Sequence, residues 1–569
     1  MFWLLTNREL QLNNRSFKSR KYLGYSIFFG SKSESSFKNN DYYDGAAAPY
    51  DKDDDLLKAS IMKPAEFTHD FENKINIKNL KGHFVFLEFE NTWFKIYSDY
   101  FGIRKYFYWL RGDEFIISND LKAITEEVGA KPSAENMAVY ALTYHFIGGL
   151  TAFQDIYYNK PGEVIEFKNG KLHFSQYWHA EELLSEKYKT DIKDIAAAFE
   201  QSVDAALEDN RSDRVSLSLT AGVDSRLLFS ILLKKDVKLH TYTYGDPHSI
   251  DCVFAQKMCN DLGIPHRVHD IRFSGDGFRS LATRVIQEGQ SLCSLHRAHR
   301  QQAVELESQY ADVMFLGTMG GEFIKGANHD DYIISDFVFE FAQNQSMEIL
   351  KKYLKKKRVR LERVDCDALF EFFRSQNWCL HPELVDFYGL VEIAAALHHA
   401  QNDMLYSHYF PKVLTPFLDL HYLRILFQSD FHFLAKKRYS SRFRQRLDNH
   451  RFAAELQYIL NRKLAKYPYN SGFMVQEYRL NPLYAAIRSR IRKKLWNYAP
   501  NFPLGSWMRE FVLSELEHLN KQNTVVRDVF EMDDLYKDLT TIDTHVTKES
   551  QWLKYTTPIQ MLLSLEIFG

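Results

Sequence analysis

Cysteine is scarce in this chain of 569 residues, and long apolar runs are missing. The five cysteines, Cys252, Cys259, Cys293, Cys366 and Cys379, are odd in number and lack CxxC spacing, so they indicate neither a disulfide framework nor a zinc site. No apolar run reaches the roughly 18 residues of a membrane span, and the short apolar opening lacks the basic start of a signal peptide. We expect a cytoplasmic protein without a membrane span.

Charge has no dominant sign either, because 72 Lys and Arg residues face 74 Asp and Glu residues. The basic stretches 351–363 and 435–446 fall in segments predicted to be helical, where exposed basic faces are common, so we expect no nucleic acid partner. The histidines at 296, 299, 398 and 399 lack HExxH spacing and are expected in the core or on the surface.

The length exceeds the roughly 250 to 300 residues of a single core, so two or three domains are expected. Up to about residue 177, short alternating apolar runs between Gly, Asn and Asp turns predict a β-rich domain. The acidic stretch 45–55 within it predicts a surface loop.

Beyond Trp178, strand-like runs alternate with helix-length segments, which predicts a doubly wound parallel sheet. From about Phe337 onward the pattern is helical. We expect domains at 1–180 and 185–500, with a C-terminal extension at 501–569 packed on the second domain. The expected strands are Val215–Leu219, Leu239–Tyr244, Arg267–Ile271 and Val313–Leu316.

The first of these strands leads into a loop of small residues and then into an apolar helix. Free N–H groups and the helix dipole at such a helix start favour phosphate. Small side chains allow close backbone approach, Ser225 adds a hydroxyl, and Asp224 is suited to a divalent cation. The predicted cofactor-binding residues here are Leu219, Thr220, Ala221, Gly222, Asp224, Ser225 and Arg226.

This loop resembles the SGGxDS loop of the N-type ATP pyrophosphatases, a group that includes asparagine synthetase, β-lactam synthetase and lasso-peptide cyclases. Thr220 replaces the family's Ser and Ala221 its first Gly, and the Walker GK[ST] ending is absent. The resemblance implies a PP-loop ATP pyrophosphatase domain that uses ATP and Mg²⁺.

Two later segments extend the resemblance. Tyr244-Gly245-Asp246 and the stretch 262–266 look like the family's second strand and its LGxxH stretch, and the backbone of Thr243, Tyr244 and Gly245 is expected to contact adenine or ribose. The stretch 316–326 resembles the GxGxDE-like segment that helps bind magnesium pyrophosphate.

That third segment departs from the family pattern. Gly317 and Gly320 are predicted to contact the cofactor, but Gly321 stands where the family has Asp, which leaves Glu322 and Asp224 as the predicted metal ligands. Thr318 occupies the place of a glutamate in asparagine synthetases and a tyrosine in β-lactam synthetases. The resemblance therefore implies a different substrate, with Thr318 and Glu322 as candidate catalytic residues.

Farther along, 415–419 resembles the family's PFLD element and 462–466 its RxK pair. A lysine there would stabilise negative charge on the phosphates and on the tetrahedral intermediate, and both Lys463 and Lys466 are candidates. We expect the substrate pocket around Ala327–Tyr332 and Leu397–Asp403.

The N-terminal region, from Gly82 to Trp178, resembles the class II glutamine amidotransferase domain, which has an Ntn-hydrolase-like fold. Active members use a cysteine directly after the initiator methionine, whose α-amine serves as base. Here Phe2 follows Met1 and no cysteine precedes Cys252. The resemblance implies a degenerate domain without glutaminase activity.

Together these segments predict an ATP-dependent ligase that adenylates the carboxylate of a small molecule, peptide or glycan, releases pyrophosphate and passes the acyl group to an amine or ammonia. Two alternatives remain, a catalytically silent ATP-binding accessory protein and an ammonia-dependent asparagine synthetase. A homodimer is also compatible with the sequence.

Overall fold

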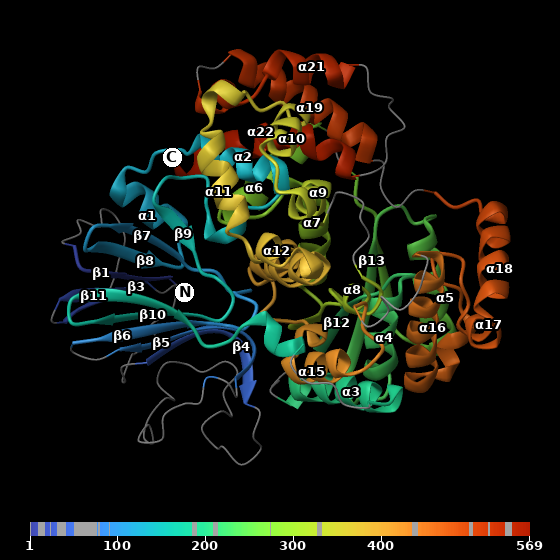
Figure 1. Cartoon of the computed structure of the whole chain (residues 1–569). Helices are drawn as coiled ribbons and strands as arrows, with labels where there is room; N and C mark the ends of the chain where they lie inside the picture. Colours follow the sequence, from blue (N-terminus) through green and yellow to red (C-terminus); the bar gives the residue numbers. More distant parts are fainter. Residues whose placement is uncertain are drawn as a thin grey trace.

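Two antiparallel sheets form the N-terminal part of the protein (Figure 1). The computed structural model describes residues 2–8, 18–22, 24–30, 41–49, 77, 80–89, 92–184, 190–208, 214–272, 275–326, 333–434, 442–499, 504–521, 524–540 and 549–569. Among these residues, one sheet has the order β2-β3-β1-β8-β7-β9 and the other β11-β10-β6-β5-β4. The first comprises β1 (Phe2–Thr6), β2 (Lys18–Tyr22), β3 (Tyr25–Gly30), β7 (Phe107–Arg111), β8 (Glu114–Ser118) and β9 (Ile156–Tyr158). The second comprises β4 (Asp41–Pro49), β5 (Leu80–Phe89), β6 (Phe94–Ser98), β10 (Glu163–Lys168) and β11 (Lys171–Gln176).

Strict alternation of side chains decides what each face of the six-stranded sheet buries. Trp3 and Leu5 of β1 join Phe94 and Ile165 in the core between the two sheets. Leu4, pointing the other way, packs with the helices α1 (Leu121–Val128) and α2 (Ala134–Thr143). The β-rich prediction for this region agrees with the structure, but the predicted loop at 45–55 is wrong for residues 45–49, which pair with β5 as part of β4.

The central part of the chain builds a parallel sheet of order β14-β13-β12-β15-β16, as the alternating pattern predicts. Its strands are β12 (Arg214–Ser218), β13 (Lys238–Tyr244), β14 (His266–His269), β15 (Val313–Phe315) and β16 (Lys412–Leu414). Helices between and around them are α3 (Ile192–Glu208), α4 (Val223–Leu232), α5 (Ile250–Leu262), α6 (Gly275–Glu288), α7 (Ala298–Glu307) and α8 (Glu322–Lys325). The strand β12 is central, so the loop that follows it opens at the middle of the sheet edge, where open α/β sheets bind ligands.

Helices dominate the rest of the chain (Figure 1). They include α9 (Asp336–Asn344), α10 (Met347–Lys356), α11 (Cys366–Arg374), α12 (Asn377–Leu380), α13 (Val385–Tyr388), the π-helical stretch η8 (Gly389–His399), α14 (Ala400–Tyr406), α15 (Leu420–Gln428), α16 (Arg442–Leu460), α17 (Val475–Leu480), α18 (Pro482–Leu495), α19 (Leu504–Lys521), α20 (Val525–Val529), α21 (Met532–Thr540) and α22 (Glu549–Phe568). The last helix packs on α6 of the central region and on α1 and α2 of the N-terminal region, so it ties the two together. Within the described residues, none of these helices combines the length and apolarity that crossing a bilayer requires.

The N-terminal and central regions meet at a buried ion pair. Asp403 of α14 has its Oδ2 3.3 Å from Nε of Arg104 and its Oδ1 3.6 Å from Nδ1 of His83. Burial raises the pKa of the Asp403 carboxyl, but the Arg104 charge and a hydrogen bond with His83 outweigh it, so the pKa lies below its usual value. The ionised carboxylate is therefore the form that holds the two regions together.

We predict that Asp403→Asn lowers the free energy of unfolding at pH 7 by about 3 kcal/mol, because it removes the buried negative charge that faces Arg104. Since the folded-state pKa is depressed, this contribution is present above the unfolded pKa of about 3.9 and is lost as pH falls through the folded value. Urea unfolding at pH 7 and below pH 4 measures both effects. The exposed Asp113→Asn is the control, and equal stability of the Asp403 variant and wild type at pH 7 contradicts the account.

Candidate active site around the loop after β12

The loop after β12 is held in shape by its own hydrogen bonds. Its backbone N–H groups at Thr220 and Gly222 donate to the Ser225 and Thr220 hydroxyls over 3.1 and 3.0 Å, and Ala221 N–H donates to Oδ1 of Asp251 over 2.9 Å. These bonds turn the chain sharply into α4. Thr220, Ala221, Gly222 and Ser225 thus lie together, as the sequence predicted.

The first turn of α4 is left open for an anion. Gly222 is the N-cap residue and gives no side-chain cap within the described part of the chain, so its helix begins with N–H groups that no capping side chain takes. A Cβ at Gly317, in the loop after β15, would lie 3.0 Å from the Ser225 nitrogen. The backbone of the glycine-rich loop therefore runs directly against the start of α4, which gives the close approach that a phosphate cradle needs.

The second glycine of that loop makes room for the PFLD element. A Cβ at Gly320 would lie 2.6 Å from the Phe417 ring, and Phe417 stacks on Phe199 of α3 with ring centroids 4.2 Å apart. Asp419 caps α15 (Leu420–Gln428) by accepting from Tyr422 N–H over 2.9 Å. The PFLD resemblance thus corresponds to a segment that supports the glycine-rich loop.

Two tyrosines that the sequence did not indicate lie beside Asp224. Burial raises the pKa of Tyr422 and of Tyr469 above their usual range, and the Asp224 carboxylate raises both further. Both hydroxyls are buried and find no hydrogen-bond partner among the described residues. They remain protonated and so act only as uncharged neighbours of the Asp224 carboxylate. Nothing in the local sequence distinguishes them from ordinary core tyrosines.

Hydrogen bonds also fix the carboxyl end of β13 beside the loop after β12. Thr243 Oγ1 donates to the Leu219 carbonyl over 2.6 Å, and Gly245 N–H donates to the His269 carbonyl over 3.0 Å. The Tyr244 ring lies 6.1 Å from that of His299. Thr243, Tyr244 and Gly245, which are predicted to contact adenine or ribose, therefore lie at the carboxyl end of β13, next to the loop after β12.

Arg226 supports the site from behind. Its guanidinium is fully buried, donates to the Tyr467 and Pro468 carbonyls over 3.1 and 2.6 Å, and lies 4.7 Å from the Tyr469 ring centroid. Burial lowers the pKa of Arg226 to about 10, so it remains charged at neutral pH. Protein carbonyls take two of its donors, whereas its Nε has no hydrogen-bond partner among the described residues, so the predicted contact of Arg226 with a cofactor stays a prediction.

We predict that Arg226→Met lowers the free energy of unfolding by about 3 kcal/mol, since two carbonyls lose their donor and a fitted side chain is replaced. Urea denaturation followed by tryptophan fluorescence measures it, with the exposed Arg111→Met as control. A loss below about 1 kcal/mol, the worth of a single ordinary hydrogen bond, contradicts the supporting role.

The candidate lysines lie in the 3-10 segment η10 (Arg462–Lys466), and both are exposed. The Lys466 ammonium lies 3.8 Å from Oδ2 of Asp261 at the end of α5, and both side chains are largely exposed, so this weak ion pair leaves its role at the phosphates a prediction. Lys463 has its backbone N–H bound to the Asn461 side chain over 3.0 Å. The chain just beyond η10 reaches the loop after β12, because Asn470 N–H donates to the Ala221 carbonyl over 2.9 Å.

The residues around the loop after β12 are suited to phosphate. They are suited to a metal ion only if phosphate oxygens complete its ligands. No group of three or more His, Cys, Asp or Glu side chains suited to a metal occurs among the described residues. Asp224 at the start of α4 and Glu322 at the start of α8 are the carboxylates available, and Glu322 Oε2 is buried without a hydrogen-bond partner in the described part of the chain. Mg²⁺ commonly binds one or two carboxylates plus substrate phosphates, which matches this pair. Thr318 is half-buried between the two loops.

The predicted substrate region is only partly visible, because Ala327–Tyr332 lies outside the described residues. Most of Leu397–Asp403 is occupied by protein contacts. Arg297 donates to the Asn402 side chain over 2.7 Å and to the His398 carbonyl over 2.7 Å. The segment Leu397–Asp403, including Asp403 itself, therefore belongs mostly to a buried polar core between the N-terminal and central regions.

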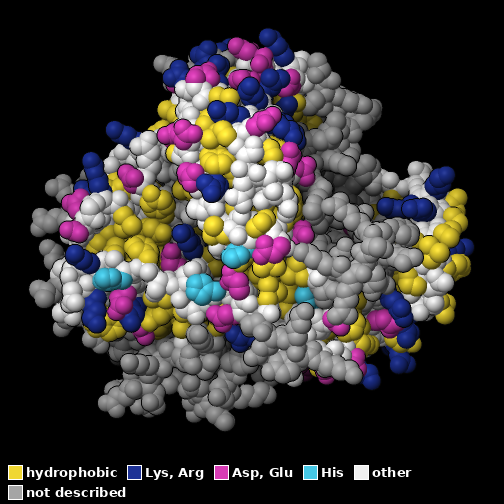
Figure 2. All heavy atoms as spheres, viewed as in Figure 1, with side chains coloured by type: hydrophobic (Ala, Val, Ile, Leu, Met, Phe, Trp, Pro, Cys, Tyr) yellow, Lys and Arg dark blue, Asp and Glu magenta, His cyan; other side chains and the backbone are white. Residues whose placement is uncertain are grey.

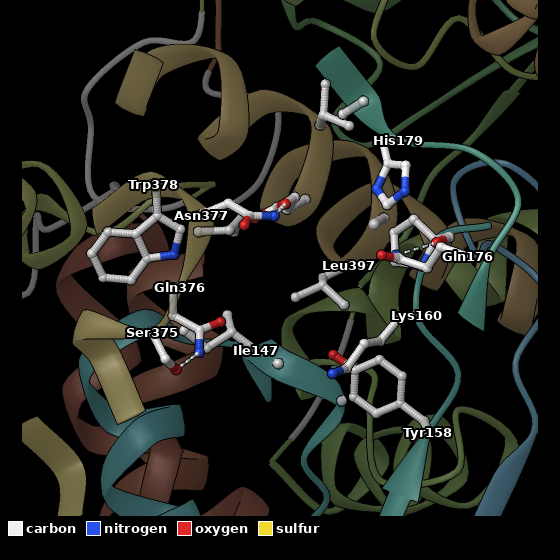
Figure 3. A pocket seen from close by; sticks show the side chains of 18 of the residues that line it. Ile147, Tyr158, Lys160, Gln176, His179, Ser375, Gln376, Asn377, Trp378 and Leu397 are labelled. Atoms are coloured by element: carbon white, nitrogen blue, oxygen red, sulfur yellow. Dashed lines mark hydrogen bonds between the residues drawn. The ribbon is translucent and has the colours of Figure 1, made fainter. Parts of the chain in front are cut away.

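A cavity of about 400 Å³ lies between the N-terminal region and the helices α11, α12 and η8 (Figure 3). Tyr158, Lys160, Gln176 and His179 line one side, and Asn377 and Trp378 lie across from them. Leu397 lines it, but none of the residues predicted for ATP or metal does. The cavity is therefore separate from the cradle after β12.

A parallel sheet with a helix that starts after its central strand places the protein among open α/β folds, and the sequence comparison identifies its family. Residues 194–532 match the profile of the asparagine synthase family, which is more than half of the chain, so the protein belongs to that family. The search of curated proteins finds no significant match.

Solved structures give only distant similarities. NMN synthetase from Francisella tularensis is 14% identical with a TM-score of 0.20 and covers 38% of this chain and 94% of its own. NH3-dependent NAD synthetase from Campylobacter jejuni is 15% identical with a TM-score of 0.18 and covers 34% and 96%. The glutamine phosphoribosylpyrophosphate amidotransferase from B. subtilis is 11% identical with a TM-score of 0.18 and covers 45% and 77%.

Proposed function

We propose that the protein is an ATP-dependent ligase that forms an amide bond through an acyl-adenylate. A substrate carboxylate oxygen attacks the α-phosphorus of ATP, the bond between that phosphorus and the α,β-bridging oxygen breaks, and pyrophosphate leaves. An amine or ammonia then attacks the acyl carbon, the bond to the AMP oxygen breaks, and the amine loses a proton. Membership of the asparagine synthase family supports an ATP-using ligase.

The observation that carries the proposal is the open start of α4. The N–H groups of its first turn, the hydroxyls of Thr220 and Ser225 and the backbone of Gly317 lie together, and such a group of donors suits an anion. In our proposal this group of donors holds the pyrophosphate portion of ATP in both the ground state and the transition state. Preorganised N–H donors stabilise the charge that develops on the leaving pyrophosphate.

Asp224 and Glu322 would hold Mg²⁺ against the phosphates, where the ion supplies charge neutralisation. The protein's own contribution is to fix those two carboxylates. Asp224 is positioned by α4 and lies beside the Tyr422 and Tyr469 hydroxyls. Lys463 and Lys466 are both candidates for a cation that reaches the phosphates, and the Lys466 ammonium also lies 3.8 Å from Asp261.

We further propose that the N-terminal region is an amidotransferase-like scaffold that releases no ammonia from glutamine, with the boundaries 1–180, 185–500 and 501–569. No cysteine occurs before Cys252. Burial raises the pKa of Cys252 to about 11 and that of Cys293 to about 12, so these thiols are not nucleophilic thiolates at neutral pH. The nitrogen donor would be free ammonia or an amine.

A second candidate is a silent ATP-binding accessory protein. It is favoured by Gly321, which offers no carboxylate at the family's second metal position, and by the engagement of Lys466 with Asp261. The two functions share the cradle and differ in turnover. Calorimetric titration with MgATP, combined with a pyrophosphate-release assay, separates them.

The test of the proposal is pyrophosphate release from MgATP in the presence of a panel of carboxylates, including aspartate with ammonium, small organic acids, peptides and uronic acid glycans. Release that depends on one carboxylate, with AMP formed in equal amount, supports a ligase. Binding of MgATP without release by any carboxylate supports the accessory protein. No binding of MgATP contradicts both.

A further inference from the structure

An apolar ridge stands out on the surface at α17 and α18. Twelve large hydrophobic side chains of the described residues are exposed, and six of them fall between Leu480 and Leu495, with exposed fractions from 47% to 83%. They are Leu480, Leu483, Tyr484, Ile487, Ile491 and Leu495. Such a concentration is unusual for a surface without a binding role.

The geometry of α18 explains why these side chains cannot reach the core. With 3.6 residues per turn, Tyr484, Ile487, Ile491 and Leu495 share one stripe along the helix, which is about 21 Å long. Ala485 and Ser489 lie on the opposite face and are buried against the rest of the molecule. In this helix the large apolar side chains therefore face solvent, whereas the small side chains face the rest of the protein.

Basic side chains border this ridge and acidic ones are missing from it. The sequence from Tyr478 to Ala499 holds six Lys and Arg residues and no Asp or Glu. Helical spacing places Arg488 and Arg490 on opposite sides of the apolar stripe and Lys494 near its end. Figure 2 shows hydrophobic side chains with Lys and Arg beside them along the edge of the molecule where α18 lies.

One member of the basic set is committed to the protein and anchors the helix. Arg492 donates to the Gly472 carbonyl over 2.8 Å and to Oε2 of Glu477 over 2.8 Å. Arg488 lies 3.6 Å from the same carboxylate. Arg490 and Lys494 are therefore the exposed cations beside the stripe, whereas Lys493, also exposed, falls on the opposite side of the helix.

We propose that α18 is a peripheral membrane-binding element that inserts its ridge into the surface of an anionic bilayer. Interfacial helices combine an apolar face of this kind with Lys and Arg residues at its borders, whose long side chains reach the headgroups while the apolar face is buried. The missing acidic residues match the negative surface potential of anionic lipids. A symmetric contact with a second copy would set the same cations against each other, which disfavours that occupant.

Docking there would bring the bilayer close to the ligase site. Gly472, which accepts from Arg492, lies two residues after Asn470, whose N–H binds the Ala221 carbonyl. The helix on the membrane and the phosphate loop are thus connected through one short segment. The proposal does not depend on the ligase activity, since membrane binding is measured without ATP.

The test is flotation of the full-length protein with phosphatidylcholine vesicles, with and without phosphatidylglycerol. We expect binding only to the anionic vesicles, weakened by salt. The triple variant Leu483→Gln, Ile487→Gln, Ile491→Gln should lose binding by at least about tenfold. Arg490→Gln with Lys494→Gln should lower it by about 30-fold. The control is Leu306→Gln with Leu380→Gln, which changes exposed leucines elsewhere.

Several outcomes overturn the proposal. The wild type fails to float with anionic vesicles, or it floats equally with neutral ones, or the triple variant floats unchanged while its circular dichroism matches the wild type. Gel filtration adds a further arm. A wild-type oligomer that the triple variant converts to monomer, without vesicle binding by the wild type, assigns the ridge to a protein contact instead, and tight RNA binding without vesicle binding assigns it to nucleic acid.

Discussion

Asp224→Ala should reduce carboxylate-dependent pyrophosphate release roughly 1,000-fold while the protein stays folded. The side chain stands at the first turn of α4 and is the carboxylate of the cradle that the proposal assigns to Mg²⁺. Its loss removes charge that offsets and orients the metal at the phosphates. Initial rates of pyrophosphate release at saturating MgATP measure the effect, with thermal unfolding as the check on folding.

Two variants sharpen that experiment. Asp236→Asn, at an exposed position beyond the end of α4, should leave the rate unchanged. Asp224→Asn keeps the shape but not the charge and should fall close to Asp224→Ala. If Asp224→Asn retains most of the wild-type rate, Asp224 acts through shape, and its assignment as a metal ligand is contradicted.

Gly317→Ala should weaken MgATP binding by about 30-fold, which corresponds to about 2 kcal/mol. The added Cβ would meet the Ser225 nitrogen at 3.0 Å and the Asp224 carbonyl carbon at 3.2 Å, both of them backbone atoms that cannot swing aside. Either loop must move, so the first-turn N–H groups lose their alignment on the phosphates. Calorimetric titration with MgATP measures the affinity.

The matched control is Gly112→Ala, where an added Cβ meets no described atom within 4 Å. That variant adds the same methyl group far from the cradle, and its affinity should equal that of the wild type. Unchanged MgATP affinity in Gly317→Ala, with the fold intact, would falsify the close approach of the two loops as a binding feature.

The sequence predicts the parallel sheet well, because its strands are short apolar runs separated by helix-length segments. The predicted Val215–Leu219 is shifted by one residue at both ends from β12, and the predicted Leu239–Tyr244 starts one residue later than β13. The loop between β12 and α4 can be predicted as well, because its small residues stand between a predicted strand and an apolar helix. What fails is β4, where an Ala-rich edge pairs with β5 although its residues resemble a loop.

The site beyond that loop depends on contacts between distant segments, which a local pattern does not contain. Arg226 holds the backbone of residues 467–468, which is more than 240 positions away in sequence. The ion pair between Lys466 and Asp261 is another such contact between distant segments. Gly320 is predicted to contact the cofactor, and the structure adds that its lack of a side chain makes room for Phe417.

The most direct test of the central claim is exchange of radiolabelled pyrophosphate into ATP, measured with the full-length protein, Mg²⁺ and each carboxylate of the panel without any amine. Reversible adenylation predicts label in ATP that depends on a carboxylate and disappears in Asp224→Ala. MgATP binding with no exchange for any carboxylate, under conditions where an authentic asparagine synthetase exchanges, would contradict adenylation by this protein.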